Sequence, residues 1–531
     1  MTIPFSSIII LLMPKIQRKI PATMATQHPD HAGRPYWNDE AYIPTIKEAR
    51  ECFLCFSDLG IDEYKWDWEG KLVDESVLER LLADHWDFFK KHPLGRDKFL
   101  TFRLPNPKVE TEFRMGRALM GIASAAGLAK QLNLHSPPLF EVILPMTESA
   151  EEMIDIQEAF AEVANLKHKL YHFEGNRGLK HIQIVPLFEQ VSTIIRSDEI
   201  LEQYLKFHKW KFGFTPPYLR PYVARSDPAL NSGIVPTMLA IKIGLSHYRD
   251  FEKKHKIKLF PVVGVGTLPF RGGISPVCIE DFTAEYAGVR TAIIQSAFRY
   301  DFQKEDVKQG IKYLQKHLPT QKAQKASRQE ERDLTELILH FEQPYQRTVE
   351  KISPLINKLA HHLPKRRERV QHIGLFGYSR GTGKVRLPRA ISFTAVMYSL
   401  GIPPELIGTG RGLKKAVDGG KIKLIEKFYV NLKLDMKKAG GFLYKPGLME
   451  LAKKSPAFKG IWEDVQEIES YLLMELGPKT PEQKQHYKLC EQLHKQLKAK
   501  KSVPRTGSAS RLVRGLTHII EKQALLRHSM G

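Results

Sequence analysis

Gly264-Val-Gly-Thr-Leu-Pro-Phe-Arg-Gly-Gly273 follows the apolar run Leu259 to Val263, an order typical of a buried strand that opens into a glycine-rich loop. The glycines of this stretch leave backbone amides unshielded by side chains. Arg271 stands at the mouth of the loop, where a guanidinium offers the planar pair of donors that holds a phosphate or a carboxylate. A structural turn with a solvated arginine is the simpler interpretation of one such loop. The rest of the sequence must decide between this turn and an anion-binding site.

The same pattern, a short strand-like run with a polar residue at its end, recurs along the chain and alternates with helical patterns. Alternating strands and helices favour a parallel sheet, and eight such units predict an α/β fold of the (β/α)8 TIM-barrel type, with its active site at the carboxyl ends of the strands. A doubly wound sheet would give a similar string. The runs interpreted as strands lie near 64–66, 99–102, 140–144, 182–188, 218–224, 259–263, 373–376 and 406–407.

The remaining segments are predicted to be helical additions to one catalytic barrel domain over 21–531, preceded by a poorly ordered extension over 1–20. Helical stripes predict an insertion between strands six and seven, over about 295–371. A second helical region is expected over 412–531. Within the insertion, the basic run 365–369 is interpreted as a solvated face.

Composition narrows the class of protein. The chain has 531 residues, 42% of them hydrophobic, which suffices for a large core. Its net charge of +22 fits either a polyanion binder or an enzyme for small anions, but the basic residues have acidic neighbours and no spaced aromatic or zinc-ligand signature accompanies them. We therefore expect no nucleic-acid partner.

The apolar run Ile8 to Met13 is too short to span a bilayer, so no membrane association is expected. Four scattered cysteines indicate a reducing compartment, which for this chain predicts the cytoplasm.

The polar residues at the strand ends form a chemically coherent set. Carboxylates that leave coordination positions open suit Mg2+ or Mn2+, and arginines around such an ion describe a site for a small phosphorylated acid. For any one of these residues, a salt bridge at the barrel rim is the simpler explanation. The set comprises the carboxylates Glu189 and Asp227, the arginines Arg103, Arg225, Arg271 and Arg380, and the loop histidine His28.

Five separated motifs, in this order, resemble the archaeal-type phosphoenolpyruvate carboxylases. The resemblance runs from about Pro21 to Arg411 and more loosely to the C-terminus. The motifs are Ala25-Thr-Gln-His-Pro-Asp30, Asp62-Glu-Tyr-Lys-Trp-Asp-Trp-Glu-Gly70, Phe99-Leu-Thr-Phe-Arg-Leu-Pro-Asn-Pro107, Gly266-Thr-Leu-Pro-Phe-Arg-Gly-Gly273 and Phe376-Gly-Tyr-Ser-Arg380.

The larger plant and bacterial carboxylases are more distantly similar, and the comparison implies roles for single residues. Their T-A-H-P-T motif is similar to Thr26-Gln-His-Pro-Asp30, which implies that His28 is catalytic. Their P-L-F-E and Y-S-D motifs match Pro186-Leu-Phe-Glu189 and Arg225-Ser-Asp227, which implies that Glu189 and Asp227 bind the metal. Their F-H-G-R-G-G loop is similar to Phe270-Arg-Gly-Gly273, and their C-terminal tail has no obvious match in Arg527-His-Ser-Met-Gly531.

The resemblance implies carboxylation of phosphoenolpyruvate by bicarbonate to oxaloacetate and phosphate, through carboxyphosphate and a metal-stabilised enolate, as an anaplerotic supply of C4 acids. It also implies a homotetramer. The expected catalytic residues are His28, Arg271 and Arg380, the expected substrate-binding residues are Arg103, Arg225, Gly272 and Gly273, and the expected cofactor is Mg2+ or Mn2+.

Two other interpretations stay open. A different barrel lyase or transferase for phosphoenolpyruvate or pyruvate would show similar carboxylates and arginines, and bicarbonate dependence separates it from a carboxylase. A basic nucleic-acid-binding scaffold without catalysis would instead show binding that weakens steeply with salt.

Overall fold

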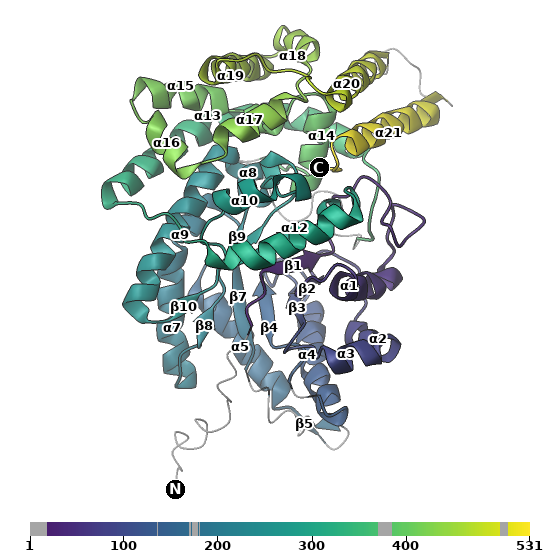
Figure 1. The fold of residues 1–531 in the computed structure, drawn as a ribbon, viewed down its shortest axis with the longest axis vertical. Helices are drawn as coiled ribbons and strands as arrows, with labels where there is room; N and C mark the ends of the chain where they lie inside the picture. Colours follow the sequence, from purple (N-terminus) through teal and green to yellow (C-terminus); the bar gives the residue numbers. More distant parts are fainter. Residues whose placement is uncertain are drawn as a thin grey trace.

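The computed structural model describes residues 19–134, 136–168, 171–172, 179, 181–369, 385–499 and 508–531. Its centre is a closed barrel of parallel strands in the order β1-β12-β11-β9-β7-β4-β3-β2 (Figure 1). The (β/α)8 prediction is therefore confirmed. The barrel strands are β1 (Thr23–Thr26), β2 (Glu63–Asp67), β3 (Phe99–Arg103), β4 (Glu141–Leu144), β7 (Gln183–Phe188), β9 (Tyr222–Ala224), β11 (Val262–Gly264) and β12 (Thr291–Ile294).

One of the predicted strands is wrong, another lies outside the described residues, and two barrel strands were not predicted. The chain enters the barrel at β1, before the first predicted strand, and closes it at β12, so all eight strands end by Ile294. The predicted strand at 406–407 falls at the end of the 3-10 helix Pro404–Leu406, where two successive prolines remove backbone donors that a ladder needs. The predicted strand at 373–376 lies outside the described residues, as do the 1–18 part of the N-terminal extension and Arg380.

The helices of 295–371 consequently follow the barrel and do not interrupt it. In this range the stripe Val307, Ile311 and Leu314 of helix α12 (Lys304–His317) is buried, and so are Leu334 and Leu337 of α13 (Arg328–Ala360). The described residues after 412 are also helical, and Figure 1 shows them stacked beyond the end of the barrel that carries α8 (Ser226–Ser232) and α10 (Ile279–Glu285).

The helices that alternate with the barrel strands surround the sheet, and short strand pairs lie outside it. Between and after the strands run α1 (Glu48–Ser57), α2 (Val77–Asp84), α3 (Trp86–Lys91), α4 (Glu112–Gln131), α5 (Ala150–Ala164), α6 (Val191–Ile195), α7 (Ser197–Phe212), α8 (Ser226–Ser232), α9 (Ile234–His255) and α10 (Ile279–Glu285). After the barrel follow α11 (Ser296–Tyr300), α12 (Lys304–His317), α13 (Arg328–Ala360), α14 (Ala390–Ser399), α15 (Thr409–Asp418), α16 (Ile422–Phe428), α17 (Leu432–Gly440), α18 (Lys445–Ala452), α19 (Pro456–Leu472), α20 (Pro481–Ala499) and α21 (Ser508–Leu526). The outer strand pairs are β5 (Lys167–His168) with β6 (Tyr171–His172), and β8 (Tyr218–Leu219) with β10 (Lys258–Leu259).

The barrel interior is layered, because alternate residues of each strand point inward. At the amino-terminal end, Arg220 lies between Glu63 and Glu141, with nitrogen to oxygen distances of 2.7 and 2.6 Å. An apolar layer follows, made of Met24, Ile143, Val185, Leu187, Tyr222, Ala224, Val262 and Ile293. These layers fill the amino-terminal part of the barrel among the described residues, which leaves the carboxyl end for a ligand site.

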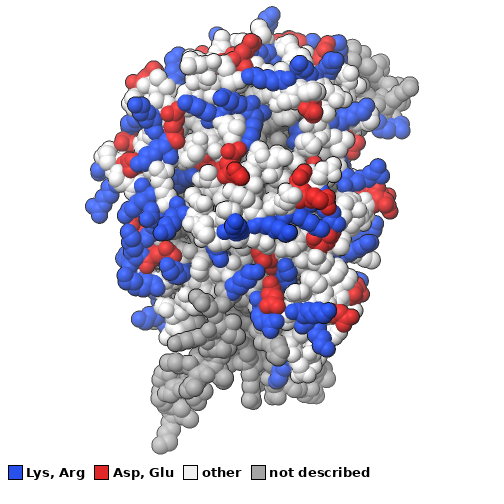
Figure 2. Space-filling view, in the orientation of Figure 1, with Lys and Arg blue, Asp and Glu red and all other residues white. Residues whose placement is uncertain are grey.

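The surface charge is mixed. On the face shown in Figure 2, lysine and arginine side chains are interspersed with acidic ones.

No single helix in the described ranges is long and apolar enough to cross a membrane; α14 and the segment Pro404–Asp418 reach that length only as a pair bent by 96°.

Candidate active site

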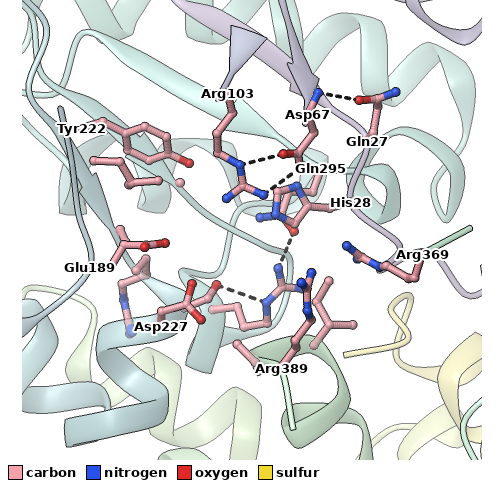
Figure 3. A pocket seen from close by; sticks show the side chains of 18 residues that line it. Gln27, His28, Asp67, Arg103, Glu189, Tyr222, Asp227, Gln295, Arg369 and Arg389 are labelled. Atoms are coloured by element: carbon pink, nitrogen blue, oxygen red, sulfur yellow. Dashed lines mark hydrogen bonds and ion pairs between the residues drawn. The ribbon is translucent and has the colours of Figure 1, made fainter. Parts of the chain in front are cut away.

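A cavity opens at the carboxyl ends of the barrel strands, where the sequence predicted the site (Figure 3). It brings together the predicted residues His28, Arg103, Glu189, Arg225, Asp227 and Arg271, which come from the ends of different strands. The rest of its wall consists of Gln27, Asp67, Leu187, Tyr222, Ala224, Ser226, Gly264, Gln295, Arg369, Arg389, Ala390 and Ile391.

The glycine-rich loop after β11 is shaped by its glycines. Gly272 and Gly273 have φ of 120° and 74°, a region that residues with a Cβ rarely adopt, and a Cβ on Gly272 would lie 2.5 Å from Cγ1 of Val265. Their amides donate inside the loop, to the carbonyls of Pro269 and Leu268 at 3.0 and 3.1 Å. The expectation that these amides stand open to an anion is therefore not met; the two glycines permit the turn that carries Arg271.

Arg271 is buried and donates to acceptors on several segments. Its Nε lies 3.2 Å from Oγ of Ser226, and one Nη contacts Asp30 at 3.4 Å. The same nitrogen donates to the carbonyl of Gly531, and the other Nη donates to Oε1 of Gln295. Burial lowers the pKa of Arg271, while Asp30 and Asp227 oppose the shift. The guanidinium thus joins the loop, the C-terminal residues and the wall of the cavity.

Residues near the C-terminus contact Arg271 of the cavity wall, although no sequence motif predicted a contact there. The amide of Met530 donates to the carbonyl of Asp30 at 2.7 Å, and Arg527 holds the Met530 carbonyl at 2.7 Å. These contacts place Gly531 against Arg271.

Arg225 lines the cavity, but its guanidinium is directed toward the glycine-rich loop. It donates to the carbonyls of Phe270 and Pro269 at 3.0 and 3.3 Å, and it is 1% exposed. This geometry gives Arg225 a contact with the backbone that carries Arg271.

Arg103, at the end of β3, is paired with two carboxylates from the end of β2. It forms a two-pronged ion pair with Asp67, each prong 2.7 Å, and a further contact with Glu69 at 2.5 Å. Burial opposes its charge, but Asp67 and Glu69 outweigh burial and raise the pKa of Arg103 well above its ordinary value. With two counterions, Arg103 contributes little net positive charge to a ligand.

The two predicted metal ligands both face the cavity. Glu189 directly follows β7, and its Oε2 accepts a hydrogen bond from the amide of Met146 at 3.1 Å, which orients the carboxylate. Asp227 lies in the first turn of α8, after β9. Both face the interior from neighbouring strands, as the pairing of β7 with β9 requires. Two carboxylates that share one cavity suit a hard cation that keeps water or substrate oxygens as its other ligands.

His28 follows β1 directly and lies in the cavity wall. Its Nδ1 is 2.9 Å from Oγ1 of Thr26, and its carbonyl accepts a hydrogen bond from Ser296. Burial, followed by the positive charges of Lys65 and Arg103, holds the pKa of His28 well below its ordinary value. The imidazole is therefore neutral at neutral pH. In the tautomer with the proton on Nδ1, donated to Thr26, Nε2 can accept a proton.

Sequence reasoning missed several residues of the cavity. Gln295 follows β12, the strand that was not predicted. Arg369 ends the basic run that was interpreted as a solvated face; within that run Arg366 and Arg367 are 6% and 2% exposed, so the interpretation is wrong. Arg389 directly precedes α14, and no motif in the sequence distinguishes it from other arginines.

Comparisons of the sequence with known proteins all find the same enzyme family. A family model described as phosphoenolpyruvate carboxylase matches residues 20–531. A protein of Leuconostoc mesenteroides subsp. mesenteroides named phosphoenolpyruvate carboxylase is 37% identical over 516 residues, which is 97% of this chain and 99% of that protein. One of the same name from the archaeon Metallosphaera sedula is 37% identical over 500 residues, 91% of this chain and 96% of its own length.

Proposed function

The chain belongs to the archaeal-type phosphoenolpyruvate carboxylase family, and from that premise we propose that its cavity carboxylates phosphoenolpyruvate with bicarbonate, giving oxaloacetate and phosphate. The observation that carries the proposal is the meeting of His28, Glu189, Asp227 and Arg271 in one cavity at the carboxyl end of the barrel. Each comes from a different strand end, and each has the chemistry that one part of the reaction needs.

The first step of the proposal transfers the phosphoryl group to bicarbonate. The bond from the enol oxygen to phosphorus breaks, a bond from a bicarbonate oxygen to phosphorus forms, and carboxyphosphate and an enolate result. Negative charge on the moving phosphoryl group needs cations and oriented donors around it. Arg271 and Arg389 supply positive charge, and Ala390 and Ile391 bring the first turn of α14 to the cavity wall, where amides and the helix dipole favour an anion. Arg380 keeps its proposed role and lies outside the described residues.

We place Mg2+ or Mn2+ on Glu189 and Asp227, whose hard carboxylate oxygens fit either ion. When bound, the cation would supply positive charge to the enolate oxygen.

In the second step His28 takes the carboxyl proton of carboxyphosphate through Nε2, and the bond between the carboxyl carbon and the oxygen that bridges to phosphorus breaks, releasing CO2 and phosphate. The enolate carbon then attacks CO2 and forms oxaloacetate. A neutral histidine is required for this step, and burial among cations keeps His28 neutral. Water must stay out, because a protonated enolate becomes pyruvate.

The family resemblance also leads us to propose a cytoplasmic homotetramer that replenishes C4 acids. Light scattering on purified protein tests the oligomeric state, and a mass other than that of four chains would refute it.

One assay tests the proposed function. Oxaloacetate should form from phosphoenolpyruvate only when bicarbonate and a divalent metal are both present. Consumption of phosphoenolpyruvate at an equal rate in bicarbonate-free buffer would indicate a different barrel lyase and would refute carboxylation.

A further inference from the structure

Arg369 lines the cavity and follows a segment whose neighbouring residues are firmly attached (Figure 3). Arg367 forms ion pairs with Glu48 and Glu51 at 2.8 and 2.6 Å. Arg366 donates to the carbonyls of His31 and Ala32 at 3.2 and 3.0 Å. These contacts fix the backbone that leads to Arg369, so its guanidinium is presented to the cavity from an anchored position.

The charge of Arg369 has no direct counterion in the described part of the chain. No hydrogen bond or ion pair joins its guanidinium to another described residue, while Asp67 and Glu69 are bound to Arg103. Burial, reinforced by the neighbouring Arg389, lowers the pKa of Arg369 to about 9, so it is still charged at neutral pH. A cation that is partly withdrawn from water and has no partner is costly, and an anionic ligand would offset that cost.

The position of Arg369 indicates which anion it meets. Figure 3 shows Arg369 on the His28 side of the cavity, with Glu189 on the opposite side. His28 and Arg369 also both lie within reach of the charges of Asp67 and Arg103. The reaction places a carboxyl group next to His28, because that histidine takes the carboxyl proton.

We propose that Arg369 binds the carboxyl group supplied by bicarbonate, holding it beside His28 through two parallel hydrogen bonds. The planar guanidinium fork matches two oxygens of a planar carboxyl group. This inference rests on the proposed carboxylase function and adds a residue for the second substrate. The phosphate of phosphoenolpyruvate has the same attraction to an arginine, so the experiment has to separate the two anions.

The test measures the KM for bicarbonate and the KM for phosphoenolpyruvate separately in Arg369→Gln and Arg369→Lys. Loss of charge-assisted hydrogen bonds should raise the KM for bicarbonate about tenfold to a hundredfold in Arg369→Gln. The KM for phosphoenolpyruvate should change by less than about threefold. The kcat of Arg369→Gln, measured at saturating bicarbonate, should stay close to that of the wild-type protein. The KM of Arg369→Lys for bicarbonate should lie between those of the wild-type protein and Arg369→Gln, because lysine keeps the charge but lacks the planar fork.

Arg386→Gln is the matched control, since Arg386 is an exposed arginine near the cavity segment and does not line the cavity. It should leave both KM values unchanged. A rise confined to the KM for phosphoenolpyruvate, equal rises of both, or no change in a folded Arg369→Gln protein would each overturn the inference. A wild-type protein without bicarbonate-dependent oxaloacetate formation would refute the proposed function itself, and the inference with it.

Discussion

Arg225 donates a hydrogen bond from Nη1 to the carbonyl oxygen of Phe270 at 3.0 Å, and this contact ties the end of β9 to the glycine-rich loop after β11. A second donor reaches the adjacent carbonyl of Pro269 at 3.3 Å. The position of Arg271 therefore depends on Arg225.

Replacing Arg225 by methionine removes these two hydrogen bonds and keeps an apolar stem. We expect kcat to fall by roughly a hundredfold, because a displacement near 1 Å of a catalytic group costs that much. The dissociation constant for phosphoenolpyruvate, measured by calorimetry, should change far less. A selective loss of phosphoenolpyruvate binding with kcat preserved would show that Arg225 binds substrate directly.

Arg271→Lys should fold normally and lose most of its activity. Lysine cannot reproduce donors to Ser226, Asp30 and Gln295 at once. The loss should be on the order of 3 kcal/mol in transition-state stabilisation, about a hundredfold in rate. Turnover at the wild-type level in a well-folded variant would remove Arg271 from the site.

Asp227→Asn and Glu189→Gln should raise the metal concentration needed for half-maximal activity, because a neutral amide is a weaker ligand than a carboxylate. A Mg2+ titration of activity measures the shift. Glu199→Gln on α7 is the matched control, since Glu199 is exposed and does not line the cavity. Unchanged titrations in both cavity variants would place the metal elsewhere.

His247 provides a pH-dependent contribution to stability that is independent of the cavity. It bridges Asp198 at 3.1 Å and Glu331 at 2.9 Å, and the hydrogen bond to Asp198 does most to raise its pKa, to about 9 from 6.5. Because the pKa of His247 is higher in the folded than in the unfolded protein, the protonated imidazole stabilises the fold. This contribution to stability is complete below pH 6.5 and is lost as the pH rises through 9.

His247→Gln should therefore lower the free energy of unfolding on the order of 1 kcal/mol near pH 6, and by much less near pH 10, the figure being reduced for partial exposure. Urea unfolding of both proteins at the two pH values measures the difference. An equal destabilisation at both would show that packing, not charge, is lost.

The barrel and much of its site could be predicted because each recognised strand ends in a polar residue. The strands β1 (Thr23-Met-Ala-Thr26) and β12 (Thr291-Ala-Ile-Ile294) were missed because each has only four residues, too few for an alternating pattern to stand out. Their burial and pairing come from the closed barrel, which no local pattern records.

Arg369 and Arg366 show a second limit. A basic run usually indicates solvated side chains, but here Arg366 donates to the carbonyls of His31 and Ala32, and Arg367 pairs with the carboxylates of Glu48 and Glu51, all of which come from distant parts of the chain. Such long-range partners cannot be seen from spacing along the sequence.

His28 carries the central claim, because it alone links the phosphoryl transfer to the new carbon bond. In His28→Asn the arginines and carboxylates of the first step remain, so carboxyphosphate should still form. Without a base, the enolate should more often take a proton from solvent and become pyruvate.

The most direct measurement quantifies phosphate, pyruvate and oxaloacetate in one reaction of His28→Asn with phosphoenolpyruvate, with and without bicarbonate. We predict bicarbonate-dependent release of phosphate with pyruvate in place of oxaloacetate. An oxaloacetate-to-phosphate ratio equal to that of the wild-type protein, even at reduced total activity, would contradict the role of His28.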